Sequence, residues 1–361
     1  MLKVTNPIIL FFIFVLIIGG IIYFSSLKNS GIQSPSLASL TTGSKSGNAP
    51  ELSEIAGYIN SNSSLTISSL SGKVILVDFW TYSCINCIRT TPYLVAWDEK
   101  YRDDGLVIIG VHSPEFEFEK DFDNVKKAVE KAGIEYPVVL DNSFSTWRNY
   151  QNQYWPHKFL IDRNGNIRYD HIGEGNYEET EEVIQNLLME NYSGSVDSSL
   201  ASNSIEPNVD FSKSKTPELY LGYEFARAPL GNIEGFKPNQ VVDYSILADT
   251  FVANRVYFDG NWKNTPDYME LASDTGKIIL KYKAQNVNIV CGGNSTISLK
   301  IDGQSVPLSI LGSDFKLQNG SSLYVSSERL YSIIEDSDNF QKTLEIDVSG
   351  KGFRIYTFTF G

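Results

Sequence analysis

Hydrophobic and polar positions divide the chain into stretches with different periods. Near the N-terminus, residues 7–24 are continuously apolar and include no charge. Between residues 51 and 191, short apolar runs typical of buried strands alternate with helical patterns. Strands are predicted at 74–80, 107–111, 138–140 and 158–161, and helices at 122–133 and 178–191. This alternation predicts an α/β domain with helices on both faces of a central sheet.

The second half of the chain has another pattern. From residue 216 on, helical periodicity disappears and short alternating runs recur, with turn dipeptides such as Asp302-Gly303 between them. The runs predicted as strands are 255–258, 268–272, 277–283, 287–290, 296–301, 323–325, 343–348 and 353–360. Many short strands at regular spacing predict an all-β sandwich at 216–361.

The apolar run at 7–24 has about the length that crosses a bilayer core. A cleavable secretory signal, cut near Ala38, is the alternative, but its apolar region usually spans only about 7–15 residues. We therefore expect a retained transmembrane helix within a membrane anchor at 1–28. Residues 29–50 and 192–215 are rich in Ser and Asn and are expected to be a flexible tether and a linker.

Composition limits the partners of this chain. Its formal net charge of −13 disfavours nucleic acid and anionic lipid as ligands. A link to the membrane therefore depends on the apolar segment. The length of 361 residues is sufficient for two domains with tethers. Three cysteines are too few for a disulfide framework, so disulfides are expected to be the chemistry of this protein and not its scaffold.

The sequence Cys84-Ile85-Asn86-Cys87 directly follows the predicted strand at 74–80. Two thiols at this spacing can close a disulfide across the first turn of a helix, whose N-terminus favours the thiolate of the first cysteine. Structural zinc is disfavoured, since only Cys291 and three scattered histidines remain as ligands. Haem attachment is excluded, because Ile88 follows the second cysteine where His is needed. A structural bridge would be strained, so we expect a dithiol that cycles.

Residues 77–94 around these cysteines resemble the active-site segment of thioredoxin-like proteins of the TlpA and redoxin group, and especially that of the DipZ-like cytochrome c biogenesis proteins. Asp78, Trp80 and Pro92 match at positions outside the cysteines. Residues 153–162 resemble the family's loop that carries a cis proline. The resemblance implies a thioredoxin fold at 51–191. It also implies that the sandwich at 216–361 is similar to a carbohydrate-binding module.

Predicted roles follow for the cysteines and the acid behind them. Cys84 is expected to attack a partner disulfide, and Cys87, one turn inside the helix, to resolve the mixed disulfide. Asp78, on a buried strand, should have a raised pKa and act as the proton shuttle. A core aspartate held by hydrogen bonds is the alternative for this residue. Ile85 and Asn86 bring no positive charge, which favours a reducing dithiol.

The substrate is expected to bind next to Trp80, Trp155 and Pro156. We predict that the Trp155–Pro156 peptide bond is cis, which exposes the backbone of Trp155 as an edge for an extended peptide. A trans proline that ends a loop is the alternative. Pro92 is expected to bend the helix that Cys84 starts.

Two other functions stay open. Thr81 and Cys84 fit part of the peroxiredoxin pattern, although Val77 stands where that pattern has proline. A peroxide-reducing enzyme is therefore one alternative. The other is a surface scaffold whose sandwich binds a glycan, with Trp262, Tyr268 and Tyr282 as stacking candidates that sandwich cores use equally well.

The resemblance also implies partners and a location. Disulfide-containing proteins are the expected substrates, and the redox-active disulfide is expected to work without a cofactor or metal. DipZ-like proteins begin with a multi-helix membrane domain that brings electrons across, and here a single predicted anchor stands in its place. We therefore expect a separate membrane electron carrier resembling CcdA. With one segment, the N-terminus is expected inside and the bulk of the chain in the extracytoplasmic space.

The remaining features receive structural interpretations. The acidic and aromatic stretch at 115–119 is expected to be a solvated edge with its aromatic side turned inward, and a docking surface for a basic partner is the alternative. His112, His157 and His171 are given no catalytic role. Gly165 is expected to turn a hairpin between two strands. Cys291 is expected to be a small buried hydrophobic residue.

Overall fold

The computed structural model describes residues 47–190, 195–205, 214–247, 250–318, 320 and 322–361. The predicted anchor at 1–28 and most of the tether at 29–50 lie outside these residues. Across the described ranges, no helix combines the length and the apolar character that a membrane crossing requires.

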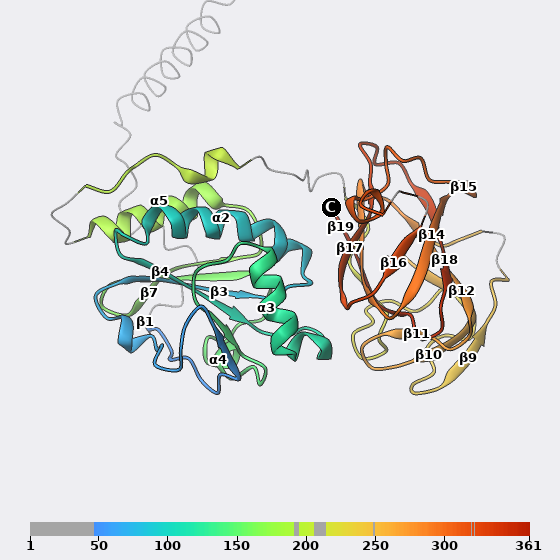
Figure 1. Cartoon of the computed structure of the whole chain (residues 1–361), viewed down its shortest axis with the longest axis horizontal. Helices are drawn as coiled ribbons and strands as arrows, with labels where there is room; N and C mark the ends of the chain where they lie inside the picture. Colours follow the sequence, from blue (N-terminus) through green and yellow to red (C-terminus); the bar gives the residue numbers. More distant parts are fainter. Residues whose placement is uncertain (1–46, 191–194, 206–213, 248–249, 319, 321) are drawn as a thin grey trace, which may run out of the picture. The chain divides into compact units, whose positions relative to one another are not determined.

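The first described part is a mixed sheet with helices on both faces (Figure 1). In spatial order its strands are β1 (Gly47–Asn48), β7 (Asn166–Ile172), β6 (His157–Ile161), β3 (Val74–Trp80), β4 (Leu106–His112), β5 (Val138–Leu140) and β2 (Gly57–Ile59). Strands β3, β4 and β5 are parallel, whereas β6 runs antiparallel to β3 and to β7. This is the thioredoxin-like arrangement that the sequence predicts.

Strand β3 shows why the sheet must be covered on both sides. All seven of its residues are buried. Successive side chains point to opposite faces, so Val74, Leu76 and Trp80 enter one core cluster while Ile75, Val77 and Phe79 enter another. Asp78 alternates in step with Val74, Leu76 and Trp80, so its side chain points to the same face of the sheet. It therefore faces the helix that carries the cysteines.

The helices of this part are α2 (Ile85–Tyr101), α3 (Phe122–Lys131), α4 (Ser145–Asn149) and α5 (Tyr177–Met189), with 3-10 turns η2 (Ser68–Leu70), η3 (Glu117–Lys120) and η4 (Ala201–Ser204). Figure 1 shows α2 and α5 on one face of the sheet and α4 on the other. Helix α2 continues through Pro92. The predicted turn at Gly165 is confirmed, since its φ is +84° and its N–H donates to Asp162 O at 2.9 Å.

Parts of the predicted tether and linker are not free chain. Gly47 and Asn48 form β1 and pair with β7, so the sheet begins inside the predicted tether. Within the predicted linker, Val196 is buried in the core cluster to which α2 and α5 contribute side chains. The carboxylate of Glu181 accepts the N–H of Ala201 at 2.7 Å and of Ser202 at 2.9 Å. Composition predicted that these segments are flexible. It failed here because composition does not show which polar segments pack against, or hydrogen-bond to, buried residues.

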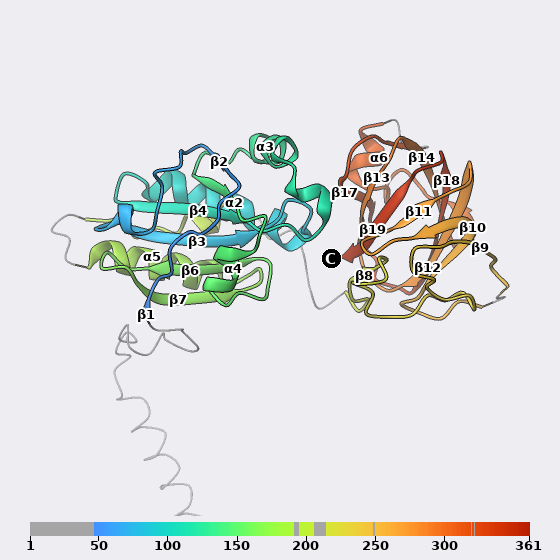
Figure 2. The same cartoon turned by 90° about the horizontal axis from the view of Figure 1, so that it is seen from below.

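The second described part is all-β apart from one short helix (Figure 2). Its elements are β8 (Leu219–Tyr220), β9 (Val241–Tyr244), β10 (Val256–Asn264), β11 (Met269–Leu271), β12 (Thr275–Tyr282), β13 (Asn286–Gly292), β14 (Ser295–Ile301), β15 (Gln304–Ser305), α6 (Ser313–Lys316), β16 (Leu323–Val325), β17 (Arg329–Glu335), β18 (Lys342–Ser349) and β19 (Arg354–Phe360). The eight predicted strands are present. Strands β8, β9, β15 and β17 and the helix α6 were not predicted.

Strand β10 joins the two layers of this part. Its first half, up to Asp259, pairs with β12, whereas its second half, from Gly260, pairs with β9 and β11. Gly260 has φ +93°, a conformation that glycine adopts without strain, and it lies where the strand changes partners. Bent strands that switch sheets in this way make the corners of sandwiches.

The sandwich core contains two of the three proposed stacking residues. Trp262 and Tyr282 are fully buried, so for these two residues packing in the sandwich core is confirmed and stacking on a sugar ring is ruled out. Alternation alone does not tell the inner face of a sandwich strand from its outer face. Tyr268 is partly exposed, with the guanidinium of Arg354 5.5 Å from its ring centroid.

Trp262→Ala is expected to lower the free energy of unfolding by about 3–5 kcal/mol, because it empties a large fully buried site. It also removes the indole donor to Asp259 O at 2.9 Å. Denaturant unfolding of the full chain measures this, with the exposed Phe340→Ala as the control. A loss below about 1 kcal/mol would show that Trp262 is not a core residue.

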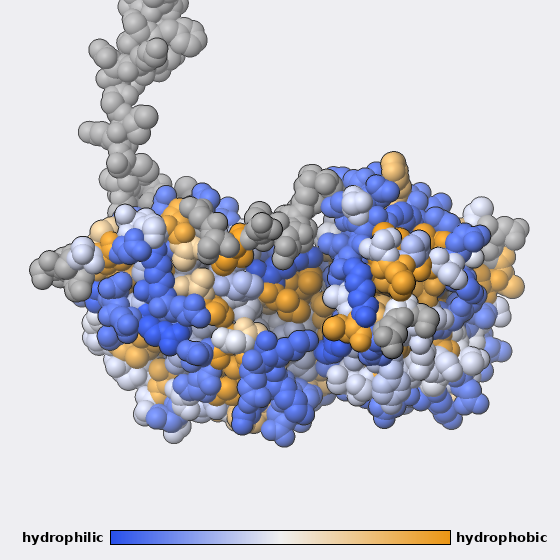
Figure 3. Space-filling view, turned by 45° about the horizontal axis from the view of Figure 1, so that its top comes forward, coloured by the Kyte–Doolittle hydropathy of each residue, from blue (hydrophilic) through white to orange (hydrophobic). Residues whose placement is uncertain are grey.

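The face of the molecule in Figure 3 is mostly hydrophilic, and its apolar areas are interrupted by polar residues.

The stretch at 115–119 only partly fits its expectation. Phe116 is buried, as predicted for the aromatic side, but Glu119 is fully buried as well. The expectation of a solvated acidic edge is therefore wrong for Glu119, because this carboxylate finds donors inside the fold.

Candidate functional site

The two cysteines of the CxxC sequence lie at the start of α2. Cys84 is the N-cap residue, and its Sγ accepts the N–H of Cys87 at 3.3 Å. Both are free thiols, with Cys84 partly exposed and Cys87 buried. Burial and the neighbouring Cys84 raise the pKa of the Cys87 thiol well above its usual value. The site thus has one accessible sulfur and one buried sulfur that needs a base before it can react.

Asp78 lies on β3 behind these sulfurs. Its side chain is buried, and desolvation raises its pKa to about 7 although the charge of Lys158 opposes the shift. Its Oδ1 has no hydrogen-bond partner among the described residues. The predicted burial and raised pKa are confirmed, and the alternative of a carboxylate held by hydrogen bonds does not describe this oxygen. A carboxyl group in this state exchanges protons near neutral pH.

Lys158 is a site residue that sequence reasoning missed. It lies on β6 directly opposite Asp78, with its side chain fully buried and its Nζ donating to Gly173 O at 2.9 Å. Burial lowers the pKa of Lys158, and the charge of Asp78 opposes this. The sequence indicates this role of Lys158 only weakly, because a lysine in a strand is usually exposed. Only the antiparallel register of β3 and β6 brings the two charges together.

Lys158→Met is expected to raise the pKa of Asp78 by about one pH unit, because it removes the buried cation that favours the carboxylate. An NMR titration of the Asp78 carboxyl measures the shift. Lys73→Met, at an exposed lysine just before β3, is the control and should leave the titration unchanged. An unchanged pKa of Asp78 in Lys158→Met would show that the charges of Asp78 and Lys158 are not coupled.

The predicted substrate-binding residues occupy different positions. The Trp155–Pro156 peptide bond is cis, as predicted. Trp155 is partly exposed and donates its indole N–H to Ser113 O at 3.0 Å, whereas Pro156 is buried and its O accepts from Gly173 N at 2.7 Å. Trp80 is buried, with its ring 5.3 Å from that of His112. Of the three side chains, that of Trp155 has the most open surface for a substrate.

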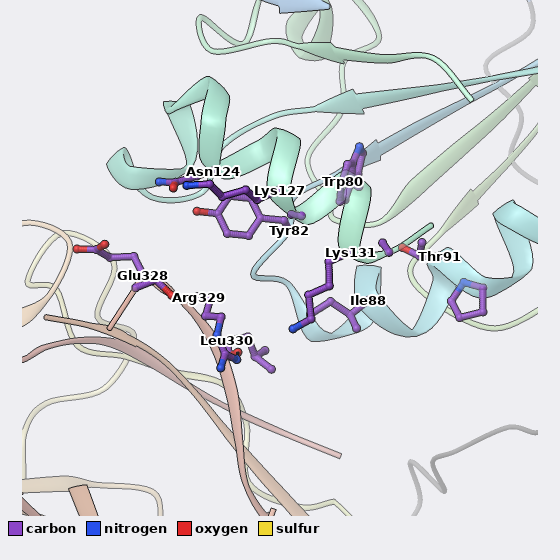
Figure 4. A pocket seen from close by; sticks show the side chains of 14 residues that line it. Trp80, Tyr82, Ile88, Thr91, Asn124, Lys127, Lys131, Glu328, Arg329 and Leu330 are labelled. Carbon is purple, nitrogen blue, oxygen red and sulfur yellow. Dashed lines mark hydrogen bonds between the residues drawn. The ribbon is translucent and has the colours of Figure 1, made fainter. Parts of the chain in front are cut away.

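A cavity of about 400 Å³ opens beside the start of α2 (Figure 4). Trp80 and Tyr82 line it together with Ile88, which is 41% exposed and directly follows Cys87. Further lining residues come from α2, from α3 with its lysines 127 and 131, and from residues 327–330 of the second part. The cavity therefore adds apolar surface next to the dithiol, although neither cysteine lines it.

The contacts of the histidines and of the third cysteine are those of residues with a structural role. His112 is fully buried, burial lowers its pKa to about 3, and its Nε2 lies 3.3 Å from Thr81 Oγ1. Thr81 is therefore buried and engaged with a neighbour. His157 lies 3.0 Å from Asp170 Oδ2. Cys291 is fully buried in the sandwich core. Within the described ranges, no group of three or more His, Cys, Asp or Glu is arranged to hold a metal ion.

The fold and the dithiol define a class: they are similar to those of thioredoxin-like thiol–disulfide oxidoreductases. More particularly, residues 45–188 match the Redoxin family, and residues 216–361 match the family described as thioredoxin like C-terminal domain. The two matches correspond to the two described parts.

The chain is similar to proteins from several organisms. Protein DipZ of Mycobacterium tuberculosis (strain CDC 1551 / Oshkosh) is 38% identical over 319 residues, which is 87% of this chain and 43% of that protein. Human NHL repeat-containing protein 2 is 41% identical over 128 residues, 35% of this chain and 18% of that protein. Thiol-disulfide oxidoreductase YkuV of Bacillus subtilis (strain 168) is 27% identical over 142 residues, 39% of this chain and 94% of that protein. The chain thus spans less than half the length of the DipZ relative.

Proposed function

We propose that this protein is a membrane-anchored, extracytoplasmic thiol–disulfide oxidoreductase that reduces protein disulfides through Cys84 and Cys87. One arrangement carries the proposal: a partly exposed Cys84 caps α2, and a buried Cys87 lies one turn inside. Behind both, the buried carboxyl of Asp78 has a pKa of about 7. This arrangement gives an attacking thiol, a resolving thiol and a proton acceptor.

The reaction proceeds in two exchanges. The Cys84 thiolate attacks a substrate disulfide, one substrate thiolate leaves, and a mixed disulfide forms. Cys87 then gives its proton to the Asp78 carboxylate and attacks the Cys84 sulfur. The Cys84–Cys87 disulfide closes and the second substrate thiol departs. Two electrons pass from the dithiol to the substrate, so a separate reductant must restore the dithiol after each turnover.

We place that reductant in the membrane. The apolar run at 7–24 and the Ser-rich segment after it support an anchor that keeps the redox part close to the bilayer. The resemblance of residues 77–94 to DipZ-like proteins favours an extracytoplasmic location, and a separate carrier resembling CcdA would supply the electrons. A glycan stays a candidate ligand of the sandwich, with Tyr268 as the remaining stacking residue.

The peroxidase alternative is less well supported. In the peroxiredoxin pattern the threonine helps hold the peroxide, but here Thr81 is fully buried and lies against His112. A scaffold with minor redox activity is also disfavoured, because Asp78, Cys84 and Cys87 are assembled as one site. Reaction of the reduced protein with peroxide at the rate of a free thiol would dismiss the peroxidase.

The test measures disulfide reduction by the detergent-solubilised full chain and its equilibrium with glutathione. A reduction potential near or below about −270 mV indicates a reductase fed by a strong donor. A value near about −120 mV would reverse the assignment to a disulfide donor. Turnover no faster than that of a free dithiol would contradict the enzyme. Recovery of the intact chain only with detergent would support the anchor.

A further inference from the structure

Glu119, in η3, is a buried acid for which the reaction above has no use. Its side chain is fully buried, and its two oxygens accept four hydrogen bonds. Oε1 accepts from Ser83 N at 3.3 Å and Ser83 Oγ at 2.5 Å. Oε2 accepts from the backbone N–H groups of Glu115 at 2.5 Å and Phe116 at 2.9 Å. One carboxylate therefore joins two segments that are distant in sequence.

The first of these segments is the active-site turn. Ser83 immediately precedes Cys84, and Cys84 N donates to Thr81 O at 3.3 Å. Holding Ser83 by both its backbone and its hydroxyl fixes the peptide that leads into Cys84. Burial raises the pKa of Glu119, while hydrogen bonds from the side chains of Ser83 and Thr81 and from the backbone lower it. Since these partners are all donors, the carboxylate is the form that satisfies them.

The second segment is held by the sandwich. Both parts belong to one compact unit. The rings of Phe116 and Phe118 lie 5.0 and 4.8 Å from that of Tyr356. The hydroxyl of Tyr220 donates to Glu115 Oε1 at 2.6 Å. Glu119 thus connects the sandwich to the residue before the attacking cysteine.

We propose that Glu119 is a positioning residue that holds Ser83 and sets the reactivity of Cys84, with the sandwich as its support. A negative charge beside the turn disfavours the Cys84 thiolate and so favours the reducing direction. The inference rests on the proposed function for its meaning. Its test, however, reads Cys84 directly and needs no substrate protein.

The test compares Glu119→Gln with Glu117→Gln in the detergent-solubilised full chain. Glu117 lies in the same turn, loses the same charge and has a side chain that is 74% exposed. Single-turnover alkylation by iodoacetamide, assigned to Cys84 by mass spectrometry, measures thiolate reactivity. Glu119→Gln is expected to react about three- to tenfold faster at pH 6, and its equilibrium with glutathione should shift by a similar factor toward the dithiol. Glu117→Gln should stay within about twofold of the unchanged protein.

Ser83→Ala separates positioning and charge from a general loss of structure. It keeps the Glu119 charge but removes the hydroxyl that partly offsets it, so alkylation at pH 6 should become slower, by about two- to threefold. A merely structural role would move both variants in the same direction. Equal rates and equilibria for Glu119→Gln and Glu117→Gln would overturn the inference. If Glu119→Gln does not fold, an unchanged rate in Ser83→Ala overturns it.

These outcomes are separate from those of the proposed function. A protein that fails to reduce disulfides refutes the enzyme whatever Glu119 does. An active enzyme in which substitutions at Glu119 and Ser83 leave the reactivity of Cys84 unchanged refutes only this inference.

Discussion

Cys87→Ser is expected to trap substrate proteins on Cys84 as a stable mixed disulfide and to lower turnover at least about 100-fold. The buried Cys87 has its N–H 3.3 Å from Cys84 Sγ, so no other thiol of the chain is placed to resolve the intermediate. Cys84→Ser should be equally inactive but should trap nothing, because it removes the attacking sulfur. Non-reducing electrophoresis after mixing with a disulfide protein distinguishes the two variants.

The control for both variants is Cys291→Ala. Cys291 is a free thiol, fully buried in the sandwich core and distant in sequence from the dithiol. It should keep full turnover and trap no substrate. If Cys84→Ser trapped the substrate and Cys87→Ser did not, Cys87 would be the attacking cysteine. This result would contradict the roles assigned from burial.

Asp78→Asn is expected to slow the attack of Cys87 on a Cys84 mixed disulfide by about 100-fold at pH 8. The pKa of Asp78 is about 7, so its carboxylate is the minor form at pH 6 and the major form at pH 8. Only the carboxylate accepts the Cys87 proton. The rate in the unchanged protein should therefore rise through pH 7, and in Asp78→Asn this rise should disappear.

Release of thionitrobenzoate from Cys84 isolates this step, because the leaving group absorbs light and does not depend on Asp78. Asp98→Asn is the matched control. It is another partly desolvated acid with a raised pKa, but it pairs at 2.7 Å with Arg102, the residue that follows α2. It should leave the pH dependence intact. An Asp78→Asn profile that still rises through pH 7 would show that another base serves Cys87.

The local pattern of the sequence was sufficient for most elements of the fold. The unbroken apolar run of β3 predicts a strand covered on both faces, and CxxC directly after it predicts the start of a helix. The cis bond before Pro156 and the buried Asp78 were also predicted, because their motif positions carry the information. Short elements such as α6 and β15 were missed, since so few residues show no period.

Periodicity also failed where it had to distinguish an inner from an outer face. For Trp262 and Tyr282 the sequence left sugar stacking and core packing open, and the structure shows that both are core residues. Residues 195–205 read as a linker, but Glu181 binds their backbone. In both cases the outcome depends on which surface lies opposite, and neighbours in sequence do not show that.

By itself, the sequence determined the thioredoxin-like class, the dithiol and the acid behind it, because these depend on residues within one strand, turn and helix. Only the tertiary structure decided what surrounds them. The antiparallel register of β6 puts the buried Lys158 opposite Asp78. The packing of residues 115–118 on the sandwich brings Glu119 to Ser83. Both contacts join segments that are far apart in the chain. Their energies arise from burial and charge at short distance, which no local pattern encodes.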